Sequence, residues 1–158
     1  MHRTLPLPLS LLLLIACQPS ALVPPAPTVL TSSRAPTEVL QAALRELKAQ
    51  GFEITASDEV RGALSARVTR RSVDFGTQLK CATLRGMDIG DRGQTTMTID
   101  LEARQRSSSA GSDVTLTSHT RTKVGEPGTP NAIDDEKVCV SSGIVEASVV
   151  KMIGAAFQ

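Results

Sequence analysis

Aromatic side chains are scarce in this chain of 158 residues, which has no tryptophan, no tyrosine and only three phenylalanines. Proteins that bind sugars or single-stranded nucleic acids use aromatic rings as stacking platforms. The scarcity argues against both ligand classes, so we expect no nucleic-acid partner. The net charge points to no partner either, because 17 basic residues nearly balance 16 acidic ones.

Cysteine is also rare, with three residues in the whole chain. The first ends the stretch Leu14-Ile15-Ala16-Cys17, which follows a basic start and an apolar run. This order is typical of a bacterial lipoprotein signal, in which cleavage leaves an acylated cysteine as the first residue. The run is too short, and too interrupted by prolines, for the ~20 apolar residues of a membrane span. We therefore predict a signal peptide over residues 1–16 and lipidation of Cys17.

The expected acyl chains determine where the protein is held. Two or three chains anchor a protein almost permanently, whereas a single chain binds reversibly. In Gram-negative lipoproteins, which this N-terminus resembles, a residue other than aspartate after the acylated cysteine favours onward transport, and here that residue is Gln18. The sequence predicts a lipid-anchored protein on the periplasmic face of the outer membrane.

Residues 17–36 contain five prolines and no acidic residue. We predict that this segment is a lipidated cysteine followed by a proline-rich stalk that does not fold. In extended polyproline geometry such a stalk would hold the domain about 50 Å from the lipid. The remaining residues, 37–158, have an ordinary size for a single domain.

The domain begins with a pattern that predicts one helix and a hairpin. Apolar residues from Thr37 to Gln50 recur at three and four positions, which indicates a helix with Thr37 as its N-cap and Gly51 as its left-handed stop. Alternation over 52–56 and again over 62–69 predicts two strands, joined by a turn around residues 57–59.

Two longer strands and a second helix follow. Residues 95–105 and 113–124 alternate between apolar or hydroxyl side chains and polar ones, as half-solvated strands do. An apolar stripe over 142–156 predicts the second helix. The fold class expected is α+β, with an antiparallel sheet of about four strands, two helices packed on one face and one disulfide.

Cys81 and Cys139 are the two thiols that remain once Cys17 is acylated. An exported protein lies in an oxidising compartment, so a structural disulfide is expected. It would close a loop of about 60 residues and stabilise the fold by roughly 4 kcal/mol in the chain-entropy model. Free or regulatory thiols are the alternative, although the chain has no Cys-x-x-Cys motif.

His119 is the only histidine of the mature chain, because His2 belongs to the signal peptide. It has no second imidazole with which to complete a zinc site, and disulfide-bonded cysteines cannot bind metal. It could act as the base for a serine nucleophile, yet the Gly-x-Ser-x-Gly motif is absent. We interpret His119 as a solvated strand residue and predict no cofactor and no metal.

Charged residues gather in two acidic runs and one basic strip. The runs 88–91 and 134–136 could bind calcium, but neither has the spacing of a known loop, and the second precedes the predicted second helix, where negative charge is stabilising. Arg67, Arg121 and Lys123 could form a basic strip on the open face of the sheet. We expect Asp100 and Glu102 on the neighbouring strand to offset it.

Two segments resemble known lipoproteins. Residues 44–54 and 58–66 resemble the helix, Gly-Phe strand, acidic turn and glycine strand of small lipoprotein domains related to BamC of the outer-membrane assembly complex. Residues 139–146 are similar to the Cys-x-Ser-Thr-Gly-x-x-Glu signature of uncharacterised proteobacterial lipoproteins, with Ser142 in place of the threonine. The resemblance covers about residues 39–66 and 139–153. It implies a fold and a location but no established activity, and envelope assembly only by analogy.

These patterns predict a non-enzymatic binding or envelope-assembly module with a protein partner in the envelope. The partner surface expected is the solvent-facing side of strand 113–124, namely Thr117, His119 and Arg121. An envelope hydrolase with an unrecognised site and a small-lipid carrier are the alternatives, and the carrier would need an apolar cavity between helices and sheet. The sequence leaves the oligomeric state open.

Overall fold

A computed structural model describes residues 22–84, 87–88, 93–107, 110–125 and 132–157. The helices are α1 (Pro36–Ala49), α2 (Ile144–Ile153) and the 3-10 segment η1 (Ser72–Gln78). The strands are β1 (Thr28–Ser32), β2 (Glu53–Asp58), β3 (Ala63–Arg71), β4 (Leu79–Cys81), β5 (Thr83–Leu84), β6 (Met87–Asp88), β7 (Gln94–Gln105), β8 (Ser112–Val124), β9 (Ile133–Asp135), β10 (Cys139–Ser141) and β11 (Ala155–Phe157).

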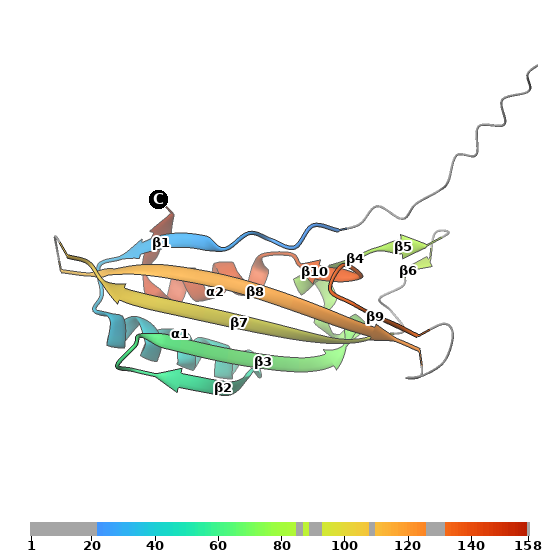
Figure 1. The fold of residues 1–158 in the computed structure, drawn as a ribbon, viewed down its shortest axis with the longest axis horizontal. Helices are drawn as coiled ribbons and strands as arrows, with labels where there is room; N and C mark the ends of the chain where they lie inside the picture. The colour runs from blue at the N-terminus through green and yellow to red at the C-terminus, as the bar shows by residue number, and fades with distance from the viewer. Residues whose placement is uncertain (1–21, 85–86, 89–92, 108–109, 126–131, 158) are drawn as a thin grey trace, which may run out of the picture.

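The main sheet is antiparallel and runs in the order β11-β1-β8-β7-β3-β2, with β9 paired to the far end of β8. Helices α1 and α2 lie behind this sheet in Figure 1, so the predicted α+β class is confirmed. The predicted number of about four strands is too small. The four expected strands form β2, β3, β7 and β8, and the sequence patterns missed β1, β9 and β11.

The two faces of the sheet differ as the alternation of β7 and β8 predicts. In β7, Met97, Ile99 and Leu101 are buried against the helices, whereas the residues between them are more accessible. In β8, Val114 and Leu116 are buried in the same layer, and the alternation predicted for this strand continues with the buried Ser118 and Thr120. The core therefore lies between one sheet face and the two helices, and the other face is open to solvent.

Helix α1 begins one residue earlier than predicted, and Thr37 is not its N-cap. The N-cap is Ala35, whose backbone N–H donates a hydrogen bond to Glu38 Oε2 at 3.3 Å, and Pro36 occupies the first helical position. A proline suits that position because the amide it lacks would have had no partner within the helix. The expected stop at Gly51 is confirmed: its φ is +82°, and Phe52 N bonds to Leu47 O at 2.9 Å, as in a Schellman motif.

The prediction that residues 17–36 form an unfolded stalk is wrong from Thr28 onward. Strand β1 lies between β8 and β11, pairing Thr28 with Leu116 and Leu30 with both Val114 and Phe157. Leu30 is fully buried in the core. The prolines that suggested a stalk flank this five-residue strand without interrupting it, so the folded domain begins before residue 37. Cys17 and the preceding signal lie outside the described residues.

Helix α2 is shorter than the predicted span of 142–156. It ends at Ile153, and Gly154 follows with a φ of +61°. The chain then turns into β11, so Phe157 belongs to an edge strand and not to the helical stripe. The buried side of α2 is formed by Val145, Val149, Val150 and Ile153.

The predicted disulfide joins Cys81 to Cys139, which pair directly in the small sheet formed by β4 and β10. Cys139 is fully buried. Its backbone carbonyl accepts a hydrogen bond from Thr120 Oγ1 of β8. The disulfide therefore connects β4, which follows η1, to β10, which precedes α2. The hydrogen bond from Thr120 attaches this pair of strands to β8 of the main sheet.

Candidate functional site: the solvent-facing surface of the sheet

The three residues predicted to meet a partner lie in one row along β8. Thr117, His119 and Arg121 alternate with the buried Ser118 and Thr120, so all three face away from the helices. His119 and Arg121 are exposed and Thr117 is half-buried. The structure confirms that they share the solvent-facing side of the sheet.

Neighbouring strands extend this row into a broad face. Across β8, β7 and β3, the residues opposite one another are Thr117, Asp100 and Ser65, then His119, Thr98 and Arg67, then Arg121, Thr96 and Thr69. We call these nine residues, together with Glu102, Thr115 and Lys123, the open face. Direct cross-strand neighbours on one face lie close enough for their side chains to interact.

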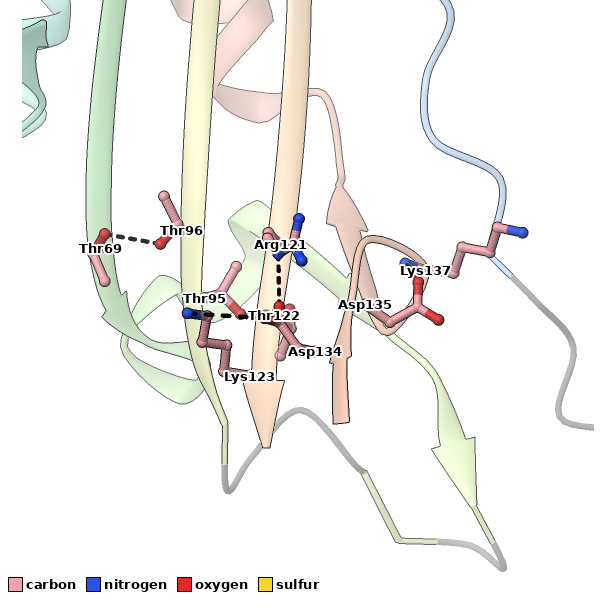
Figure 2. Close-up of polar contacts among 9 residues, drawn as sticks. All are labelled: Thr69, Thr95, Thr96, Arg121, Thr122, Lys123, Asp134, Asp135 and Lys137. Atoms are coloured by element: carbon pink, nitrogen blue, oxygen red, sulfur yellow. Dashed lines mark hydrogen bonds and ion pairs between the residues drawn. The ribbon is translucent and has the colours of Figure 1, made fainter. Parts of the chain in front are cut away.

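Two hydrogen bonds fix side chains of the open face. Ser65 Oγ donates to Asp100 Oδ1 at 2.6 Å. Thr69 and Thr96 join their hydroxyl groups at 2.9 Å, as Figure 2 shows. Each bond restricts the rotamers of the two side chains that it joins, and the β-branched threonines have few rotamers to begin with, so this part of the face is ordered.

The charges of the open face are segregated along the strands. Arg67, Arg121 and Lys123 lie toward one end, and Asp100 and Glu102 lie toward the other, as the pairing register requires.

The prediction that Asp100 and Glu102 offset the basic strip is wrong. Arg67 pairs with Glu53 of β2 at 3.5 Å, and Lys123 pairs with Asp134 of β9 at 3.8 Å. Glu102 pairs with Arg104 of its own strand. The neutralising carboxylates therefore come from the strands that flank the strip, because those side chains are opposite it in register.

Asp134 occupies a different place from the one predicted. It does not lie at the start of α2, because β9 folds back beside β8 and brings its carboxylate to the open face. Arg121 Nε donates to Asp134 Oδ1 at 2.6 Å, the contact drawn in Figure 2. This hydrogen bond holds the pKa of Asp134 below its ordinary value and raises the pKa of the Arg121 guanidinium. A three-residue strand is too short to produce an alternating pattern, so the sequence contained no clear signal for it.

A buried chain of hydroxyl groups supports this end of the sheet from the other side. Thr95 Oγ1 bonds to Ser72 Oγ at 2.7 Å and to Thr122 Oγ1 at 2.8 Å. Figure 2 shows Thr95 and Thr122 side by side on β7 and β8. A buried polar group costs stability unless it is hydrogen-bonded, so the chain keeps these strands and η1 together.

The residues of the signature segment form a local hydrogen-bonded unit. Ser141 Oγ accepts from the backbone N–H of Gly143 at 3.1 Å and donates to Glu146 Oε2 at 2.8 Å. Gly143 is the N-cap residue of α2 and has a φ of +89°. These bonds fix the turn that leads into α2, and none of the described side chains caps the helix itself.

The His119 side chain forms no hydrogen bond or ion pair with any residue that the structure describes, although its backbone is paired with Thr98 in the sheet. Within the same residues, no group of three His, Cys, Asp or Glu side chains is placed to hold a metal ion. No helix in the described part of the chain is long and apolar enough to cross a membrane. The predicted acidic run at 88–91 lies outside the described residues from position 89 onward.

Comparison with known proteins adds no family. The chain matches no protein-family model, and a search of curated proteins finds no significant match.

Proposed function

We propose that this chain is an outer-membrane lipoprotein, anchored by Cys17, whose domain acts as a non-enzymatic binding or assembly module in the periplasm. Its partner is a protein of the envelope that docks on the open face. The observation that carries the proposal is the row of Thr117, His119 and Arg121 on a sheet face that no described element covers. The similarity to BamC-related domains is part of this proposal and not evidence for it.

The chemistry of the open face supports recognition of a protein. It combines hydroxyl groups in fixed positions with exposed charges, of which Arg67, Arg121 and Lys123 are paired with carboxylates of the flanking strands. An interface of this composition relies on hydrogen bonds and electrostatic complementarity more than on apolar burial. We expect its affinity to fall as salt is added, because exposed charges are screened.

The size of a cavity on the helical side of the sheet favours the binding module over the lipid carrier. The space between α2, β8 and the segment before β1 measures about 170 Å³. Sites for small molecules usually enclose about 300–1,000 Å³. A space of this size does not hold an acyl chain, so the open face is the better candidate.

Crosslinking in cells tests the proposal. Thr117→Glu, His119→Glu and Arg121→Glu together should abolish the crosslinked partner band while the melting temperature stays close to that of the unmodified chain, because single surface changes usually cost within about 0.5 kcal/mol each. The matched control is Arg45→Glu with Lys48→Glu, two exposed residues on α1. Both variants lower the net charge by four units, with histidine counted as neutral.

Retained crosslinking in the open-face variant, with loss in the α1 variant, would move the partner to the helical side of the domain. That result would contradict the proposed docking surface.

A further inference from the structure

The helices present a second surface to solvent, on the side of the domain opposite the open face. Helices α1 and α2 lie side by side behind the main sheet in Figure 1, joined by the hydrogen bond from Ser148 to Glu46. Four exposed cations belong to this side, and we call them the basic patch: Arg34 just before α1, Arg45 and Lys48 on α1, and Lys151 on α2.

The basic patch has no ion pairs, in contrast to the basic strip of the open face. No carboxylate of the described residues lies within ion-pair distance of any of its four cations, whereas every member of the strip is paired. Of the three carboxylates on α1 and α2, only Glu38 is exposed, and it accepts from the N-cap amide. Glu59, from the turn after β2, accepts from Gln41 Nε2 at 2.8 Å. The exposed charge of this side is therefore mainly positive.

A hollow of about 410 Å³ lies beside the first turns of α1. Its lining residues are Arg34, Thr37, Glu38, Gln41 and Arg45. Arg34 is held in place there, because its Nη1 donates a hydrogen bond to Met152 O at the end of α2 at 3.0 Å. A guanidinium has five N–H donors in a planar arrangement that suits the oxygens of a phosphate. The hollow thus offers two arginines to a phosphate group.

Apolar side chains accompany the cations on α2. Ile144 and Met152 are 47% and 42% exposed, although both are large apolar residues. Ile144 and Lys151 are two helical turns apart and both exposed, so they share the outward side of α2. A helical surface that combines cations with exposed apolar side chains is typical of proteins that lie on anionic membranes.

We propose that the basic patch, with Ile144 and Met152, rests on an anionic phospholipid surface, and that Arg34 and Arg45 receive headgroup phosphates in the hollow. The inference rests on the proposed function in one respect, because the lipid anchor brings the domain to a membrane. Residues 18–27 allow a reach of about 34 Å, which exceeds the helix diameter of about 10–12 Å. Docking in this orientation turns the open face toward the periplasm, where its partner binds.

The test is NMR spectroscopy of the full acylated chain in lipid nanodiscs with nitroxide-labelled headgroups, which broaden the amide resonances of residues near the membrane. In discs of phosphatidylglycerol and phosphatidylcholine, Gln41 and Lys151 should lose at least about twice as much intensity as Thr98 and His119 of the open face, because each basic residue near an anionic surface strengthens the attraction roughly fivefold. The difference should disappear in discs of phosphatidylcholine alone and shrink as salt is added.

Two variants with equal charge loss locate the contact. The first removes the basic patch through Arg34→Gln, Arg45→Gln, Lys48→Gln and Lys151→Gln, and the selective broadening of the helices should be lost. The matched control removes four cations from the other side of the sheet through Arg67→Gln, Arg104→Gln, Arg121→Gln and Lys123→Gln, and the broadening should remain.

A smaller variant keeps the bond from Arg34 to Met152, in case the loss of that bond unfolds the end of α2. Arg45→Gln with Lys48→Gln should lower the ratio of docked to undocked domain roughly 25-fold, at roughly fivefold for each cation. Ile144→Ser should weaken docking as well, because it removes apolar contact with the lipid.

Equal broadening of the two faces in anionic discs would overturn the proposal, as would broadening of the helices that is just as strong in phosphatidylcholine discs or survives the loss of the basic patch. Its failure is distinct from a failure of the proposed function. An anchored chain that does not dock still enters both kinds of disc and keeps its crosslinked partner, whereas a chain without the anchor is absent from the phosphatidylcholine discs while anionic discs still broaden its helices.

Discussion

Ser148 Oγ of α2 donates a hydrogen bond to Glu46 Oε1 of α1, across 102 positions of the chain. The bond joins the two helices that cover the core, and Gln50 Nε2 donates a second bond to the same oxygen. Together, with Ser148 the larger cause, these donors hold the pKa of Glu46 below its ordinary value.

Ser148→Ala should lower the free energy of unfolding at neutral pH by about 1 kcal/mol. A carboxylate whose pKa is lowered by folding contributes stability above its unfolded-state pKa, and loses that contribution as the pH falls through the folded-state value. The difference between variant and unmodified chain should therefore shrink in acid. Urea denaturation at pH 7 and pH 3 measures it, and Lys151→Ala on the same helix is the exposed control.

Three variants that remove the disulfide should lose similar amounts of stability, because each lacks the same single bond. Cys81→Ser, Cys139→Ser and the double variant should each lower the free energy of unfolding by a similar amount, about 4 kcal/mol in the chain-entropy model. Chemical denaturation of the three proteins measures it. Additive losses would be inconsistent with a bond between Cys81 and Cys139.

The buried hydroxyl chain makes Thr95 more sensitive than its neighbour. Thr95→Val keeps the shape but leaves the Ser72 and Thr122 hydroxyls short of a partner, so the variant should be less stable by roughly 1–3 kcal/mol. Thr96→Val, on the open face, should change stability by no more than about 0.5 kcal/mol. Thermal denaturation compares them, and equal losses would contradict the role given to the buried chain.

The contact between Arg121 and Asp134 predicts a change in titration. Arg121→Gln should raise the pKa of Asp134 toward its ordinary value, because the hydrogen bond from Arg121 is the main cause of its lowering. Carboxyl ¹³C NMR follows this pKa directly. Lys123→Gln, which removes the more distant cation, should raise it less, and the reverse order would place Asp134 nearer to Lys123 than the structure does.

The proposed anchor predicts the fate of the precursor. Cys17→Ser should leave an unacylated chain and prevent its fractionation with the outer membrane, because the acyl chains supply the membrane affinity. Membrane fractionation and immunoblotting measure it, with Ser20→Ala as the control outside the signal. A Cys17→Ser chain that still fractionates with the outer membrane would contradict the lipid anchor.

Strands with long alternation were predictable to within one residue. β7 and β8 alternate over 12 and 13 residues, so their register and solvent-facing side chains follow from the sequence. Strand β1 was missed because the prolines around it dominate the composition, although its own five residues contain none. Strand β11 was missed because Phe157 continues the helical spacing of α2, and only the conformation of Gly154 reveals the break.

The candidate site was predictable in part for the same reason. Alternation alone places Thr117, His119 and Arg121 on one face, but it cannot supply the partner of Arg121, which comes from a three-residue strand after a separate connection. The cavity was not predictable either. It depends on how α2, β8 and the segment before β1 pack against one another, and the sequence patterns do not specify that packing.

The position of β1 between β8 and β11 also determines how a force applied at the proposed anchor would reach the domain. Only ten residues, 18–27, lie between Cys17 and β1, which allows a reach of about 34 Å instead of 50 Å. Because residues 22–27 run along the direction of β1 in Figure 1, tension would load the hydrogen bonds between β1 and β8 in shear, all at once and not one after another. A tether at Cys17 would thus be mechanically coupled to the domain through an interior strand of the sheet.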